Sequence, residues 1–165
     1  QKLANMLKEL NVPHVVDPFK TLPVYVGKTA YFRLHGLGKR LYYYQYSDEE
    51  LKKLFEIVKD YEEKTEEIYV LFNNLSMFDD AIRFKHYIEK GSFPSLTEAV
   101  GLESIRQVLS KTRYPASKST LLKKVGWKLV EIEKGRQVRL EKLLEKIPSR
   151  TYNDIEEVIR EIKNL

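Results

Sequence analysis

The sequence predicts an α/β unit followed by a small all-α domain, and three observations lead to this fold class. Strand-like and helix-like segments alternate as far as Lys90, whereas every periodic segment after Ser95 is helical. Residues 1–90 balance fourteen basic against fourteen acidic residues, so the net charge of +5 comes from the remainder. The segment GSFPS between them is typical of a linker. The predicted organisation is an α/β unit at 1–90, a linker at 91–95 and a basic helical domain at 96–165.

Each segment of the first unit is predicted from its own pattern. Branched and aromatic residues mark the strands, and Gly36 ends the second of them. Ser47 and Glu50 form a capping box that begins a helix with an apolar stripe. The apolar run EIYVLF predicts a strand buried on both faces, and strands that alternate with helices pair in parallel. The predicted strands are 13–17, 29–35 and 67–72, and the predicted helices are 2–10, about 48–61 and about 78–89.

Every periodic segment of the second part indicates a helix. The apolar residues after Gly135 fall on one face, and so do those after Asp154. Asn153 is the predicted cap of the last helix, with Glu156 completing its capping box. The predicted helices are about 96–111, 118–125, 135–147 and 154–163.

Composition excludes several classes of protein. The chain has no cysteine, which removes disulfides, thiolate nucleophiles and thiolate metal sites. No run approaches the roughly 18 apolar residues of a membrane span, and no signal peptide is visible, so we expect a cytoplasmic protein without membrane contact. Abundant Lys, Glu, Ile and Tyr with scarce Gln favour a thermophile source.

Three strands are too few to close a barrel and would leave hydrophobic edges exposed. The chain also begins at Gln1, without Met, inside a segment with helical spacing. We therefore expect an N-terminal barrel segment outside this chain, or a partner chain, to complete the sheet.

Polar residues stand where the predicted strands end, which is where parallel β/α folds place their sites. His35 could be a general base or a metal ligand, and Arg33 could bind an anion. The alternative is a structural polar network, a cap or a turn. The candidate catalytic residues are Asp17, Arg33, His35, Asn73 and Asn74; no metal or other cofactor can be named from them.

The loop after the second strand combines two glycines with two cations. Such a loop could bind phosphate through its backbone N–H groups, although it lacks the spacing of a Walker loop. The alternative is a solvated turn. The candidate anion-binding residues are Gly36, Gly38, Lys39 and Arg40.

A stretch without acidic residues runs from Ser104 to Val130 and holds seven cations and the single tryptophan, Trp127. Such a stretch could neutralise the phosphates of DNA or RNA. The alternative is a solvated face or a protein contact, balanced by nearby glutamates. The candidate nucleic-acid-binding residues are Arg106, Lys111, Arg113, Lys118, Lys123, Lys124 and Lys128.

At YFRLHG, YYYQYSDEEL and YVLFNN the chain resembles the C-terminal part of the YecE-like family (domain of unknown function seventy-two), over roughly residues 1–90. The resemblance implies the last three strands of a TIM-type barrel, with Arg33, His35, Asn73 and Asn74 at the barrel mouth. That family has no settled activity, so no catalytic role is implied for these residues.

At YPASK and IPSRTYNDIEEV the second part resembles a small helical family (domain of unknown function twenty-seven ninety-five), over residues 102–162. This chain carries an additional KLVEIEKGR between its helices, and that family has no assigned function.

Two hypotheses of function follow. In the first, the basic domain binds DNA or RNA and the barrel mouth holds a ligand. In the second, the barrel is a metal-dependent or acid/base hydrolase or isomerase that acts on a small phosphorylated or sugar-like compound, and the helical domain serves assembly.

Overall fold

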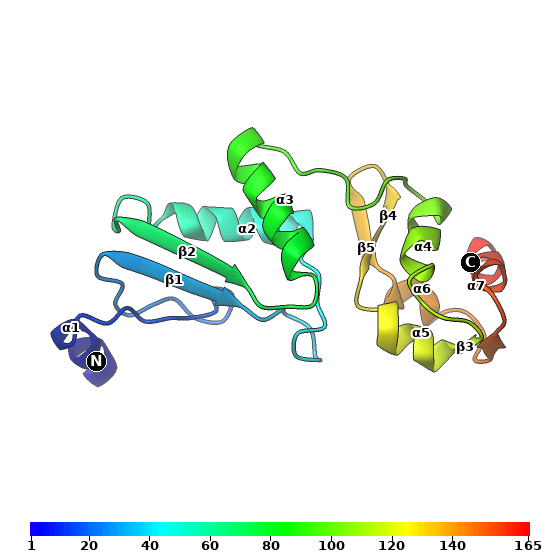
Figure 1. The fold of residues 1–165 in the computed structure, drawn as a ribbon, viewed down its shortest axis with the longest axis horizontal. Helices are drawn as coiled ribbons and strands as arrows, with labels where there is room; N and C mark the ends of the chain where they lie inside the picture. Colours follow the sequence, from blue (N-terminus) through cyan, green and yellow to red (C-terminus); the bar gives the residue numbers. More distant parts are fainter. The chain divides into compact units, whose positions relative to one another are not determined.

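Seven helices and three two-stranded sheets make up residues 1–165 in the computed structural model (Figure 1). The chain divides into two units, Gln1–Phe93 and Pro94–Leu165, with the boundary inside GSFPS. The predicted α/β character is confirmed. None of the seven helices combines the length and the apolar character that crossing a bilayer requires.

The first unit is built around two parallel strands. Strand β1 (Thr29–Leu34) pairs with β2 (Glu67–Phe72), and the two are joined by α2 (Asp48–Lys59). The predicted parallel pairing is therefore confirmed. The predicted strand at 13–17 is reduced to a single bridge between Val16 and Phe32, because the chain turns at once through hydrogen bonds to the Asp17 carbonyl.

The predicted capping box at the start of α2 is present. The Ser47 hydroxyl accepts a hydrogen bond from the backbone N–H of Glu50, and the Glu50 carboxylate accepts one from the N–H of Ser47. The predicted apolar stripe of this helix is also present, since Leu51, Leu54 and Val58 are buried against the sheet.

Only one face of the β1–β2 sheet is covered. Ala30, Phe32 and Leu34 are fully buried, whereas Tyr69 and Leu71 are exposed on the other face. The prediction that β2 is buried on both faces was wrong. Its apolar residues are continuous in sequence, but the helices of this unit pack against one side of the sheet.

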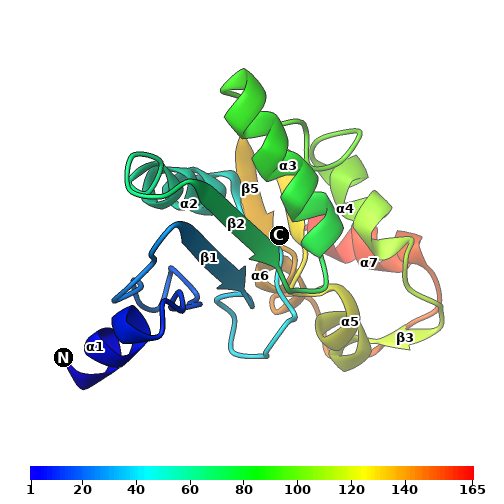
Figure 2. The ribbon, with the colours of Figure 1, turned by 60° about the vertical axis from the view of Figure 1, so that its left-hand side comes forward.

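Helix α3 (Met77–Lys90) buries polar groups and exposes apolar ones. Asp80 and Arg83 are buried, whereas Phe78 is 74% exposed. Helix α1 (Lys2–Glu9) buries none of its residues. In both views α1 stands away from α2 and α3, which lie side by side (Figures 1 and 2).

The prediction of an all-α second domain was wrong, because four short strands lie among its helices. The predicted helix at 135–147 splits into a strand and one helical turn, since Gly135 has φ +76° and turns a hairpin. The predicted helix at 96–111 begins only after Gly101. The elements are α4 (Leu102–Leu109), β3 (Ala116–Ser117), α5 (Lys118–Val125), β4 (Leu129–Glu133), β5 (Arg136–Arg139), α6 (Glu141–Leu144), β6 (Thr151–Tyr152) and α7 (Ile155–Lys163).

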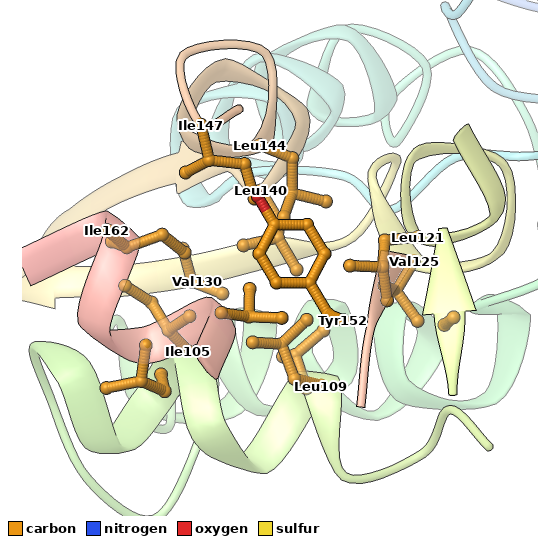
Figure 3. Close-up of a cluster of buried hydrophobic side chains, with 14 residues drawn as sticks. Ile105, Leu109, Leu121, Val125, Val130, Leu140, Leu144, Ile147, Tyr152 and Ile162 are labelled. Carbon is orange, nitrogen blue, oxygen red and sulfur yellow. The ribbon is translucent and has the colours of Figure 1, made fainter. Parts of the chain in front are cut away.

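One hydrophobic cluster holds the second unit together. The Tyr152 ring lies at its centre, and side chains from α4, α5, β4, α6 and α7 surround it (Figure 3). Its hydroxyl donates to the carbonyl of Pro148 (2.7 Å), which satisfies the one polar group of this side chain. Leu109, Leu121, Leu140 and Leu144 are fully buried around it.

The cap of α7 lies one residue later than predicted. The Asp154 carboxylate accepts a hydrogen bond from the N–H of Glu157 (2.9 Å), whereas Asn153 donates its side-chain amide to Glu157. Asn and Asp cap helices about equally well, so the sequence NDIEE leaves the register open.

Candidate functional site

The polar residues at the strand ends of the first unit form three separate groups. In the first, the nearly buried Asp17 carboxylate accepts hydrogen bonds from the N–H groups of Phe19 (3.2 Å) and His35 (3.3 Å). The Asp17 carboxylate oxygen that accepts from the backbone N–H of His35 also lies 3.8 Å from Nδ1 of the His35 imidazole. The structure thus brings Asp17 and His35 together and leaves the imidazole half-buried.

The second group is Arg33 with Asn73. The Arg33 side chain is exposed on the open face of the sheet and has no carboxylate partner. It borders a groove of ≈ 510 Å³ together with Asn73 and apolar side chains. The apolar lining consists of Tyr31, Leu71, Phe72, Met77, Phe78 and Ala81. An exposed cation beside an amide in an apolar groove could bind an anionic group on an apolar or aromatic compound.

The third group is a buried network around Asp80, which the sequence analysis missed. The carboxylate accepts hydrogen bonds from the Asn74 amide (2.7 Å), the Tyr46 N–H (3.2 Å) and Arg83 (3.2 Å). Arg83 also donates to the Tyr46 carbonyl (2.7 Å) and pairs with Asp48. These bonds connect the loop before α2, the end of β2 and the first turns of α3.

Burial raises the pKa of the Asp80 carboxyl to about 6, although the hydrogen bonds from Asn74 and Tyr46 and the charge of Arg83 act in the opposite direction. Burial likewise raises the pKa of the Tyr46 hydroxyl well above its ordinary value. Asp80 is therefore the carboxyl group of this unit whose charge depends on pH near neutrality.

A spacing of three residues on α3 was the one available signal for this network. Asp80 and Arg83 lie on the same side of the helix, between apolar residues. An apolar stripe usually marks the buried face of a helix, and in α3 that expectation points to the wrong side.

The loop after β1 is held by its own tyrosines. The Gly36 N–H donates to the Tyr46 hydroxyl (2.8 Å), and a Cβ on Gly36 would lie 2.4 Å from the Cβ of Tyr44. The Arg40 guanidinium stacks on the Tyr43 ring, 3.1 Å from its centroid. Gly38 and Lys39 are exposed. The N–H of Gly36 is thus already engaged, and phosphate binding by this loop stays a prediction.

Several of the seven candidate cations of the second unit have internal contacts. Arg106 pairs with Glu103 and Glu156. Lys118 donates to the carbonyls of Glu145 (2.7 Å) and Ile147 (2.8 Å). The Lys128 ammonium lies over the Trp127 ring, 4.9 Å from its centroid.

Four of the seven cations are solvent-exposed: Lys111, Arg113, Lys123 and Lys124. Lys111 and Arg113 follow α4, and Lys123 and Lys124 lie in the last turn of α5. Lys111 also borders a groove of ≈ 580 Å³ beside α4. No group of three or more His, Asp or Glu side chains is arranged so that it could hold a metal ion.

Comparison with family models decides the relationship of the first unit. The model described as "Protein of unknown function DUF72" matches residues 1–93, more than half of the chain. The chain belongs to the DUF72 family. The family expected from YFRLHG, YYYQYSDEEL and YVLFNN is thereby confirmed, and the DUF72 match contains Asp17, Arg33, His35 and both asparagines.

The second unit matches a different model, described as "Family of unknown function (DUF5789)", over residues 99–165. This is not the family that YPASK and IPSRTYNDIEEV suggested. No curated protein and no solved structure matches this DUF72 chain.

Proposed function

We propose that this DUF72 protein associates with nucleic acid, and that its C-terminal unit binds the phosphates of DNA or RNA. The observation that supports the proposal is the exposure of Lys111, Arg113, Lys123 and Lys124 within a stretch that has no acidic residue. Exposed cations attract a polyanion and release its condensed counterions on binding.

Burial and internal contacts narrow the surface that the sequence indicated. Arg106 and Lys118 are held by carboxylates and carbonyl groups of the same unit, so they contribute less to the field outside. The proposed contact centres on the exposed Lys123 and Lys124 at the end of α5, with the exposed Lys111 and Arg113 as the second pair.

The test is salt-dependent binding of the full chain to a labelled 20-base-pair duplex and to single-stranded DNA and RNA of the same sequence, followed by fluorescence anisotropy. Lys123→Glu/Lys124→Glu should lower affinity by about tenfold or more and reduce the salt slope by about 1.8. Lys52→Glu/Lys53→Glu is the matched control, because it changes another exposed lysine pair on α2 of the charge-balanced unit.

Two outcomes would sink the proposal. One is a wild-type chain that binds none of the three nucleic acids at 50 mM salt. The other is an equal loss of affinity in the α5 and α2 variants, which would mean that only the total charge matters.

A second candidate function is a ligand site or an enzyme active site in the first unit, which acts on a small phosphorylated or sugar-like compound. The observation that favours it is the unpaired Arg33 beside Asn73 in an apolar groove. The neighbouring Asp17–His35 pair could supply acid/base chemistry, since an imidazole can both donate and accept a proton and the carboxylate oxygen lies 3.8 Å from its Nδ1.

In this reading the first unit is part of a TIM-type barrel. The parallel β1–α2–β2 order supports this interpretation. The open edge and the open face of the two-stranded sheet support it as well, because a barrel strand is paired on both edges and covered on both faces. A further segment, or a partner chain, would then pair with the free edge of β2 and cover Tyr69 and Leu71.

A further inference from the structure

The β4–β5 hairpin presents a second basic feature, outside the stretch that the sequence analysis selected. Its turn, Glu133–Arg136, is exposed at all four residues and carries Lys134 and Arg136. Arg136 approaches Glu133 only loosely (3.5 Å), and both side chains are more than 60% exposed. An ion pair of this kind adds little stability and leaves the guanidinium available to a partner.

The turn is held in one conformation by a buried acid. The Glu131 carboxylate accepts a hydrogen bond from the Gly135 N–H (2.8 Å), and the Glu131 backbone bonds to Ser104 and Gly101. The second carboxylate oxygen of Glu131 is buried without a partner. Burying a carboxylate oxygen without a hydrogen-bond partner costs free energy. The second unit is therefore less stable for holding Glu131 in the position from which it orders the exposed turn.

A bulge in β4 also shapes the hairpin. The register shifts between Glu131 and Glu133, which makes Ile132 the additional residue, and Ile132 packs against the core. Bulges increase the twist of a hairpin and change the direction of the residues beyond them. The turn cations are thus anchored to the core through Ile132 and to α4 through Glu131.

The hairpin lies between two basic positions of the chain. It runs away from the α5 end of the unit, and its turn lies at the far end (Figure 1). The four steps from Leu129 to Glu133 span about 13 Å at the rise of a strand. Lys123, Lys124 and Lys128 precede the base of the hairpin, while Lys134 and Arg136 lie at its tip.

We propose that the β4–β5 turn is a second nucleic-acid contact, in which Lys134 and Arg136 reach one side of a duplex groove while the α5 lysines bind the other side. A groove about 12 Å wide admits a two-stranded ribbon and places phosphates on both sides at a fixed separation. The preferred partner is therefore a duplex. This inference rests on the proposed function of the second unit.

The experiment compares the full chain with Lys134→Ala/Arg136→Ala on a 20-base-pair duplex and on its single strand, with Lys52→Ala/Lys53→Ala as the control. We expect the hairpin variant to lose about tenfold in duplex affinity and at most about threefold on the single strand. Thermal unfolding followed by Trp127 fluorescence verifies that the second unit is folded.

Substitutions of Glu131 distinguish an ordered turn from a simple effect of net charge. Glu131→Ala makes the chain more basic, so charge alone predicts tighter binding, whereas a disordered turn predicts about threefold weaker duplex binding. Glu131→Gln keeps an oxygen acceptor for Gly135 and should bind at least as tightly as wild type. A Glu131→Ala chain that is folded and binds the duplex more tightly would overturn the positioning role.

The results separate this inference from the proposed function. If Lys123→Glu/Lys124→Glu weakens binding and the hairpin variant does not, the hairpin contact is wrong and the proposed function stands. Equal losses on duplex and single strand would overturn the groove-spanning geometry. A wild-type chain that binds neither would overturn both.

Discussion

The Asp80 network makes the stability of the first unit depend on pH. Asp80 has a pKa of about 6 when folded and 3.8 as its ordinary value. Between these values the folded chain holds a proton that the unfolded chain has released. The stability contributed by the neutral carboxyl is therefore complete below pH 3.8 and is lost as pH rises through 6. The difference corresponds to about 3 kcal/mol.

Asp80→Asn removes this titration while keeping the size of the side chain. We expect the free energy of unfolding of wild type, minus that of Asp80→Asn, to fall by about 2 kcal/mol between pH 4 and pH 7, because the unfolded carboxyl is already partly ionised at pH 4. Any constant effect of the amide cancels in this difference. Asp79→Asn is the matched control, because Asp79 is the exposed neighbour on α3. Its charge is the smallest of the causes that raise the pKa of Asp80, so this variant should follow wild type closely, with a slightly smaller fall.

Amide hydrogen exchange at Phe32 and Leu34, both fully buried in β1, measures the stability of the first unit in the full chain. Trp127 fluorescence reports the second unit separately and should give the same pH profile in all three proteins. A difference that does not change with pH, or that rises from pH 4 to pH 7, would refute the role assigned to burial of Asp80.

Two further predictions concern the loop after β1 and the groove. Gly36→Ala should destabilise the first unit by about 3 kcal/mol, because φ is +91° and the new Cβ meets Tyr44; Gly91→Ala, at φ +69° with nothing within 4 Å, should cost about 1 kcal/mol. Equal costs in chemical denaturation would contradict the close approach. Arg33→Met should abolish the shifts that phenyl phosphate causes at the Asn73 amide in an NMR titration, whereas unchanged shifts would remove Arg33 from the groove site; Lys39→Met tests the adjacent loop in the same titration.

Except for the strand expected at 13–17, the elements of the first unit were predictable because local interactions decide them. The side chains of Ser47 and Glu50 each accept a hydrogen bond from the backbone N–H of the other within one turn. The β–α–β order favours parallel pairing of the two strands. The second unit was predicted less well, since residues 135–147 have both a helical spacing and a turn glycine. Packing of Val130 and Ile132 on the core favours the hairpin over a longer helix.

The candidate site was predictable only as a set of polar residues at strand ends. Strand alternation is enough to place Tyr31 and Arg33 on one face, opposite Phe32 and Leu34, as the burial of β1 also has them. It could not show that Asp17 lies with His35, Arg33 with Asn73, and Asn74 with Asp80, because these groupings depend on contacts between distant segments.

The sequence by itself determined where β1, α2 and β2 begin, which residues are charged, and that the basic excess lies after residue 90. Only the tertiary structure decided which of those charged side chains are bound by other groups of the chain and which face solvent. Arg106, Lys118 and Arg83 are bound internally, whereas Lys124, Lys134 and Arg33 face solvent. The reason is that the cost of burying a charge, and the partner that offsets it, depend on groups that approach only in the folded chain.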